Sequence, residues 1–108
     1  LEALPEERHP EWVSELEGYK NEMILPAPKP YGPEAIIEAV HRHCTEDTVV
    51  ATDVGQHQMW TMQFYPFEKP HTLLTSGGLG TMGYGLGAAI GAQNGNPDAQ
   101  VVNIAGDG

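Results

Sequence analysis

Basic residues are scarce in this sequence. Five Lys and Arg stand against 15 Asp and Glu, so the formal net charge is −10 at pH 7. A protein of this charge repels the phosphates of nucleic acids and of anionic lipids. Hydrophobic runs are also short, because none approaches the roughly 20 apolar residues that span a bilayer, and the acidic, proline-containing N-terminus is unlike a signal peptide. We therefore expect partners that are neither nucleic acids nor membranes.

Cysteine is nearly absent. Cys44 is the single cysteine, so the chain cannot form an internal disulfide, which agrees with a reducing compartment. We expect a cytoplasmic location, or a plastid or mitochondrion if the source is eukaryotic. His41 lies one helical turn before Cys44, but two ligands do not complete a tetrahedral zinc site. The segment "HRHC" is therefore not predicted to bind a metal.

Glycine, in contrast, is concentrated in one stretch. Residues 76–92, "SGGLGTMGYGLGAAIGA", hold seven of the 13 glycines, with the spacing G-x-G-x-x-G at Gly78, Gly80 and Gly83. Glycines let backbone N–H groups approach an anion, and the N-terminus of a following helix adds partial positive charge. The stretch therefore favours a diphosphate as ligand. Three further glycines fall inside the expected helix, where we interpret them as sites of close packing: Gly85, Gly87 and Gly91.

Acidic residues divide the chain into two parts. Eleven of the 15 precede residue 48, which indicates different roles for the two halves. We expect residues 1–29 to form an acidic surface helix followed by a proline-rich linker, and the folded domain to begin at residue 30. Trp12, Val13 and Leu16 share one face of the expected helix after Pro10, which predicts that this face packs.

Helices and strands alternate from residue 33 onward. The patterns predict helices over 33–44, over 56–65 and from the glycine-rich stretch to about residue 94, and strands over 48–52, 71–76 and 100–105. This alternation predicts an α/β fold with a parallel sheet flanked by helices. Ligands of such sheets bind at the carboxyl ends of the strands. The segments that follow the strands should therefore meet on one rim: "DVGQHQ", "SGGLGTMG" and "GDG".

Several interpretations of this rim stay open. A dinucleotide-binding oxidoreductase would use the Gly78, Gly80, Gly83 pattern, with Asp107 at the end of the next strand to hold ribose hydroxyls. A noncatalytic fragment would bind no small molecule. Individual residues also have structural alternatives: Met82 could fill a core gap, and Asp107 could cap a following helix. Asp53 is expected to cap or orient its loop rather than to touch a ligand.

The segments "TDVGQHQMW", "SGGLGTMGYGLGAAIGA" and "GDG", in this order and spacing, resemble the cofactor-binding domain of thiamine diphosphate enzymes. Among these enzymes, the three segments are most similar in sequence to the acetohydroxyacid synthase family, also called acetolactate synthases. The similarity is strong over residues 49–108. It implies that residues 30–108 form the N-terminal part of a thiamine diphosphate-binding domain of the pyrophosphate type, truncated at the GDG motif. One departure is Gly87, where the family usually has proline.

The resemblance also implies the cofactor contacts. Gly80 and Met82 would lie against the aminopyrimidine, with Met82 as an apolar wedge that keeps the cofactor bent. Asp107 would ligate a Mg²⁺ ion that bridges the diphosphate oxygens, since a hard cation prefers oxygen ligands. Its neighbours in the GDG motif, Gly106 and Gly108, would lie beside the cofactor. The diphosphate would be contacted by the segment after the first strand: Val54, Gly55, Gln56 and His57.

For a complete protein, the resemblance implies decarboxylation of pyruvate and transfer of the two-carbon unit to a second 2-ketoacid. The product would be acetolactate or acetohydroxybutyrate, in the biosynthesis of valine and isoleucine. Family members also carry FAD, form homodimers or larger assemblies and often bind a regulatory small subunit. The sequence does not contain the Asn that completes the metal motif or the glutamate that activates the pyrimidine, so residues 1–108 alone are not expected to catalyse. Another thiamine diphosphate decarboxylase or lyase is the nearest alternative.

Overall fold

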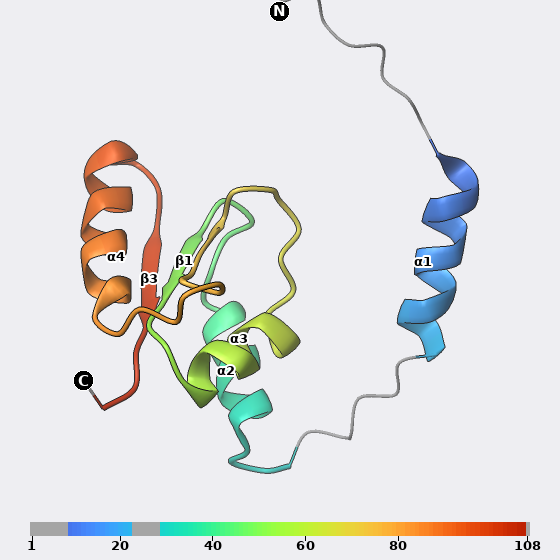
Figure 1. Ribbon diagram of the computed structural model, residues 1–108, viewed down its shortest axis with the longest axis horizontal. Coiled ribbons are helices and arrows are strands. Elements are labelled where there is room, and N and C mark those ends of the chain that lie inside the picture. Colours follow the sequence, from blue (N-terminus) through green and yellow to red (C-terminus); the bar gives the residue numbers. More distant parts are fainter. Residues whose placement is uncertain (1–8, 23–28, 108) are drawn as a thin grey trace, which may run out of the picture.

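The computed structural model describes residues 9–22 and 29–107. Helices and strands alternate along the chain after the first helix, as Figure 1 shows. The bounds of the elements are α1 (Pro10–Glu22), α2 (Pro33–His41), β1 (Val49–Thr52), α3 (Gln56–Phe64), β2 (Leu73–Leu74), α4 (Tyr84–Gly95) and β3 (Val101–Ile104).

The three strands form one parallel sheet in the order β2-β1-β3. In the centre, Val50 is paired with Leu73 of β2 and with Val102 of β3. The connection through α3 leads to one neighbour of β1, and the connection through α4 leads across to the other. Helix α4 covers one face of the sheet, and α2 and α3, which contact each other, lie on the other side (Figure 1). The prediction of an α/β fold with a parallel, helix-flanked sheet is confirmed.

The core lies around the central strand. All four residues of β1 are buried because both edges of this strand are paired and both faces are covered. Val50 packs with Ile37 of α2 and with Tyr65, which directly follows α3. Trp60, Phe64 and Tyr65 are therefore packing residues in this structure. The partly buried residues around this cluster are Val40, Cys44, Trp60, Phe64, Phe67 and Ile104.

Strand β2 is shorter than the predicted strand over 71–76. Only Leu73 and Leu74 are in the ladder, because β2 is an edge strand whose only described neighbour is the four-residue β1. On its amino side, His71 has a φ of 64°, which is not a strand conformation. On its carboxyl side, the Thr75 hydroxyl accepts hydrogen bonds from the side chains of Thr52 and Gln58.

The glycines of α4 are not equivalent. A Cβ at Gly85 would lie 2.7 Å from the backbone nitrogen of Asp53 and 2.9 Å from the carbonyl carbon of Thr52. Only glycine fits here, because α4 crosses directly against the end of β1. A Cβ at Gly87 or Gly91 would meet nothing within 4 Å. The prediction of close packing is therefore confirmed for Gly85 and wrong for Gly87 and Gly91.

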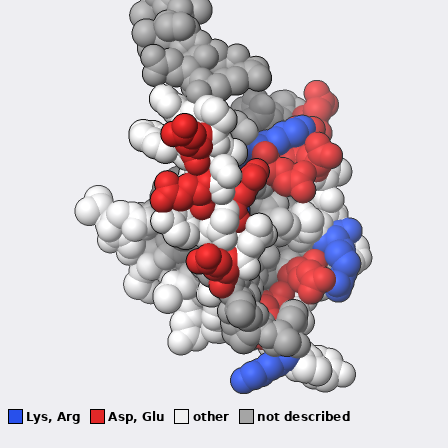
Figure 2. All heavy atoms as spheres, turned by 90° about the vertical axis from the view of Figure 1, so that its right-hand side faces the viewer, with Lys and Arg blue, Asp and Glu red and all other residues white. Residues whose placement is uncertain are grey.

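Helix α1 forms as predicted but buries none of its residues. Trp12, Val13 and Leu16 are exposed to 66%, 53% and 59%, so the expected packing of this face is not found among residues 9–22 and 29–107. The side of the molecule that Figure 2 shows carries more acidic than basic residues, in line with the net charge. Residues 23–28 of the predicted linker lie outside the described residues. In the described part of the chain, every helix is too short or too polar to span a membrane.

Candidate cofactor site

The segments that follow β1, β2 and β3 meet at the carboxyl end of the sheet. The strand order reverses at β1, and ligands of open α/β sheets bind at such a switch point. Here the three segments enclose a cavity of about 280 Å³. It is lined by Asp53, Val54 and His57 from the first segment, Met82 and Gly83 from the second, and Gly106 and Asp107 from the third.

His57 lies in the first turn of α3, between the β1 and β3 segments. A Cβ at Gly106 would be 3.0 Å from Cε1 of the imidazole, so the ring and the GDG backbone are in direct contact. Nε2 of His57 is the one buried side-chain nitrogen or oxygen without a hydrogen-bond partner among the described residues. Buried polar atoms are nearly always hydrogen-bonded in folded proteins. The unpaired Nε2 is available to form a hydrogen bond with a ligand oxygen.

Asp53 holds the rim together. Its side chain is buried, and Oδ1 accepts hydrogen bonds from the backbone N–H of Val54 at 2.9 Å and of Gly83 at 3.0 Å. Oδ2 lies 3.2 Å from the nitrogen of Gly83. The prediction that Asp53 orients its loop is confirmed.

Three backbone N–H groups of the glycine-rich segment donate hydrogen bonds within the protein. Gly80 N donates to the carbonyl of Ser76, Thr81 N donates to the Ser76 hydroxyl, and Gly83 N donates to Asp53. A dinucleotide fingerprint presents the amides of its glycine-rich turn to the pyrophosphate. The amides of Gly80, Thr81 and Gly83 are engaged by the protein. This geometry favours neither the dinucleotide interpretation nor the expectation that these three amides bind a diphosphate.

The other expected contact residues differ in their positions. Gly80 is next to the rim, since a Cβ there would be 3.6 Å from Val54 Cγ1. Gly55 adjoins His57, whose Nδ1 would be 3.2 Å from a Cβ on that glycine. The thioether of Met82 is largely exposed at the cavity rather than buried as core filler.

Three of the expected residues remain. Asp107 is exposed and lines the cavity. Gln56 is exposed at the start of α3 and is not among the residues that line the cavity. Gly108 lies outside the described residues.

A buried polar network beneath the rim was not anticipated from the sequence. Thr52 and Gln58 both donate to the hydroxyl oxygen of Thr75, at 2.7 and 2.8 Å. One turn further along α3, Thr61 donates to the carbonyl of His57 at 2.7 Å. These bonds fix the first turn of α3, and with it His57, to the ends of β1 and β2. The sequence offered one signal for this network. Gln58 and Thr61 are three residues apart and so lie on the same face of the helix.

Residues 53–108 match the family described as "Thiamine pyrophosphate enzyme, C-terminal TPP binding domain". The matched segment contains all three rim segments and more than half of the chain. The chain belongs to this family. The resemblance drawn from the three motifs is thereby confirmed at the level of the thiamine pyrophosphate enzymes.

Curated relatives of this thiamine pyrophosphate enzyme domain carry consistent names. The chain is 46% identical over 111 residues to the acetolactate synthase isozyme 1 large subunit of Escherichia coli, covering 100% of the chain and 19% of that protein. It is 46% identical over 101 residues to the chloroplastic acetolactate synthase of Arabidopsis thaliana, covering 90% and 15%. To the mitochondrial catalytic subunit of Aspergillus candidus acetolactate synthase it is 55% identical over 78 residues, covering 69% and 11%. The chain therefore spans about a fifth or less of the length of these relatives.

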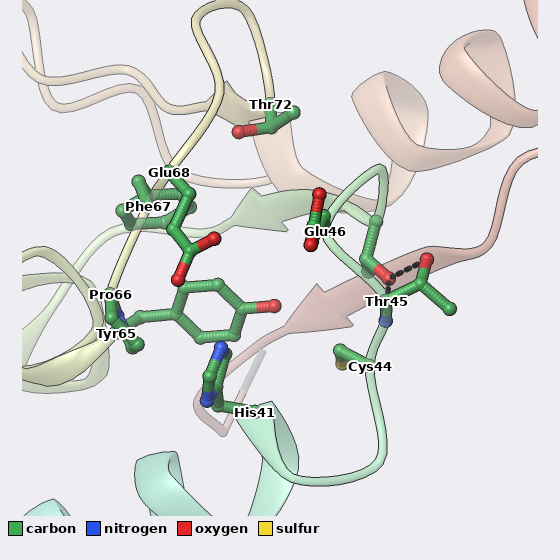
Figure 3. Close-up of a pocket in the computed structure, with 10 residues that line it drawn as sticks. His41, Cys44, Thr45, Glu46, Tyr65, Pro66, Phe67, Glu68 and Thr72 are labelled. Carbon is green, nitrogen blue, oxygen red and sulfur yellow. Dashed lines mark hydrogen bonds between the residues drawn. The ribbon is translucent and has the colours of Figure 1, made fainter.

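A second cavity of the domain lies at the opposite, amino end of the sheet (Figure 3). It measures about 210 Å³ and includes His41 and Cys44 of the "HRHC" segment. The Tyr65 ring meets His41 edge-on, with 5.0 Å between ring centroids. Burial raises the pKa of the Tyr65 phenol, and the Cys44 thiol beside it adds to this rise. Within residues 9–22 and 29–107, no group of three or more His, Cys, Asp or Glu is placed to hold a metal ion.

Proposed function

We propose that the full-length protein that carries this chain is an acetolactate synthase that depends on thiamine diphosphate and Mg²⁺. It would decarboxylate pyruvate and transfer the two-carbon unit to a second 2-ketoacid, giving acetolactate or acetohydroxybutyrate for valine and isoleucine biosynthesis. The family match and the names of the relatives support this class of reaction. The observation that carries the proposal is the rim itself. There a buried nitrogen of His57 that has no partner among residues 9–22 and 29–107 lines one cavity together with Asp107, from α3 and from the segment after β3.

The residues of the rim fit the diphosphate of the cofactor. His57 Nε2 would donate a hydrogen bond to a phosphate oxygen and so gain the partner that it lacks in the described residues. Gly106 has no side chain, which leaves its backbone open to the ligand beside the imidazole. Val54, Gly55 and Gln56 would complete this contact from the segment after β1, with Gly108 on the GDG side.

Asp107 is the proposed Mg²⁺ ligand. A carboxylate oxygen suits this hard cation, and an ion between Asp107 and the phosphates would offset the charge of both. This matters in a chain with a net charge of −10, which otherwise repels an anionic cofactor. The remaining oxygen ligands would come from the phosphates, from water and from an Asn outside residues 1–108.

Met82 and Gly80 would hold the other end of the cofactor. The exposed thioether of Met82 lines the cavity across from His57, and apolar contact there would position the aminopyrimidine ring. When bound, thiamine diphosphate supplies the electron sink for loss of the pyruvate carboxylate. The described residues bind and orient the cofactor.

Further properties of the full-length protein follow from the same proposal. Residues 1–29 would connect a preceding part of the protein to the cofactor domain that begins at residue 30. FAD would be bound outside residues 1–108, two or more copies would share the active site, and a regulatory small subunit would associate with the catalytic one. The location would be cytoplasmic, or a plastid or mitochondrion in a eukaryote.

The test uses the full-length protein. Calorimetric titration with thiamine diphosphate in the presence of Mg²⁺ should show saturable binding, and pyruvate should be converted to acetolactate. Asp107→Asn should raise the Mg²⁺ concentration for half-maximal activity by about tenfold or more, because a charged ligand is lost. Asp98→Asn, at an exposed position between α4 and β3, serves as the matched control.

Two results would contradict the proposal. One is the absence of thiamine diphosphate binding by the full-length protein. The other is binding of a nicotinamide dinucleotide without Mg²⁺. Residues 1–108 alone are expected to bind the cofactor weakly at best, and tight Mg²⁺-dependent binding by this segment would show that the rest of the protein contributes less than proposed.

A further inference from the structure

Asp53 connects two cofactor-facing loops that are far apart in the sequence. Its Oδ1 accepts from Val54 N within its own loop and from Gly83 N, 30 residues away, at the start of α4. Only 8% of Asp53 is exposed, so water competes little for this carboxylate. A hydrogen bond to a charged, buried acceptor is stronger than one between neutral groups.

The two N–H groups belong to loops that both contribute side chains to the cavity. Val54 itself lines it from the β1 segment, and Met82, which directly precedes Gly83, lines it from the segment after β2. One carboxylate therefore fixes the separation between these two side chains. Met82 is 78% exposed, so packing by its neighbours does little to hold it in place.

The contact between α4 and β1 reinforces this connection. At Gly85, a Cβ would lie 2.7 Å from the backbone nitrogen of Asp53, so the helix can approach no closer. The close contact limits the approach of the two segments, and the carboxylate prevents their separation. Without the carboxylate, α4 would still pack on the sheet, but its first residues would lose the hydrogen bond that ties them to the β1 segment.

We propose that Asp53 is a positioning residue of the cofactor site: its carboxylate ties Gly83 to Val54 and thereby fixes the backbone beside Met82 relative to the β1 segment. This inference rests on the proposed function. Asp53 acts through its two backbone partners, because its carboxylate oxygens are engaged by the N–H groups of Val54 and Gly83.

The experiment compares three variants of the full-length protein. Asp53→Ala removes both acceptor oxygens. Asp53→Asn keeps an Oδ1 acceptor for both N–H groups and places an amide donor at the Oδ2 position, 3.2 Å from the nitrogen of Gly83. Asp98→Asn is the control. The measurements are the dissociation constant for thiamine diphosphate with Mg²⁺, the KM for pyruvate at saturating cofactor, the thermal midpoint without cofactor, and hydrogen exchange of the peptide that contains residues 76–84.

We expect Asp53→Ala to weaken cofactor binding by at least about tenfold and Asp53→Asn to recover only part of that loss, because it keeps the Oδ1 acceptor without its charge. The pyruvate KM should stay within about twofold of the wild-type value, and exchange of the 76–84 peptide should rise in the alanine variant. Exchange that rises more in the 76–84 peptide than in the other peptides separates a local change from a general loss of stability.

The possible results separate the two proposals. If the wild-type protein binds thiamine diphosphate and Asp53→Ala binds it equally well, the positioning role is wrong and the proposed function stands. The role is also wrong if Asp53→Ala only lowers the thermal midpoint, with cofactor affinity and exchange unchanged. If the wild-type protein does not bind the cofactor, both proposals fail.

Discussion

The two ends of the sheet differ in the hydrogen bonding of their buried polar groups. At the amino end, the Thr48 hydroxyl donates to Gln100 Oε1 at 2.7 Å and accepts from Thr45 N at 2.8 Å. The amide nitrogen of Gln100 in turn donates to the carbonyl of His43 at 3.2 Å. At the carboxyl end, His57 Nε2 is buried and has no partner within the described residues.

The difference shows at which end the protein satisfies its own buried polar groups. A network in which protein groups satisfy each other stabilises the fold, whereas an unsatisfied buried atom costs free energy until something binds it. The amino end is therefore structural, although it also contains a cavity. The carboxyl end is where we propose that the cofactor binds. The following predictions test this contrast and are ordered by the expected change in the free energy of unfolding.

Gly85→Ala should have the largest effect. Its Cβ would lie within 3 Å of backbone atoms of Thr52 and Asp53, which cannot move without shifting β1. We expect a loss of about 3 kcal/mol in the free energy of unfolding, measured by denaturation of the full-length protein. Gly87→Ala is the control: its Cβ meets nothing within 4 Å, so it should stabilise α4 by about 0.5–1 kcal/mol. Equal effects of the two substitutions would contradict the close contact between α4 and β1.

Thr48→Val should destabilise the amino end. Valine has nearly the same shape but neither donates to Gln100 nor accepts from Thr45 N. Because residue 48 is 2% exposed, we expect a loss of about 2 kcal/mol in a denaturant titration. Thr81→Val, at an exposed position of the rim, should cost much less. A neutral result at residue 48 would show that the network does not stabilise this end.

Tyr65 should make stability depend on alkaline pH. Burial raises the pKa of this phenol in the folded state, while the unfolded chain ionises near pH 10. The neutral phenol is thus favoured by folding, and stability is lost as the pH rises above the unfolded pKa. Thermal unfolding between pH 9 and pH 11 should show a steeper decline for the wild type than for Tyr65→Phe. Tyr31→Phe, at a fully exposed position, should decline as steeply as the wild type does.

His57→Phe should change stability least and binding most. Phenylalanine fills the place of the ring and removes a buried nitrogen that has no described partner. The free energy of unfolding without cofactor should therefore change by less than about 1 kcal/mol. Affinity for thiamine diphosphate should fall by about tenfold to a hundredfold, since a hydrogen bond to a charged group is lost. A large loss of stability with unchanged affinity would mean that His57 stabilises the fold and does not bind the cofactor, which would contradict the contrast between the two ends.

Much of the fold could be predicted because its signals are local. The β-branched run over 48–52 and the glycines after it marked a buried strand that opens into a loop, and the structure has β1 there. The length of β2 could not be predicted, because an edge strand is as long as its pairing with β1, and pairing is not a local property. The exposed face of α1 was predicted to pack because periodicity identifies an apolar face but not what covers it.

The site was predictable to the extent that motifs mark it. His57 and Asp107 were singled out from their segments, and the structure brings both to one cavity. The bond between Asp53 and Gly83 and the network of Gln58 with Thr75 join residues from different loops. Such meetings depend on how α3 and α4 cross the sheet, which sequence patterns alone do not give.

The order of the strands also bears on how the protein is made. Val50 pairs with Leu73 on one side and with Val102 on the other, so β1 has an open edge until β3 has been synthesised. An open edge in a nascent chain invites pairing with another chain. The cavity is completed by Gly106 and Asp107, which follow this same strand. We therefore expect cofactor capture to follow the synthesis of β3, after this edge of β1 has been closed.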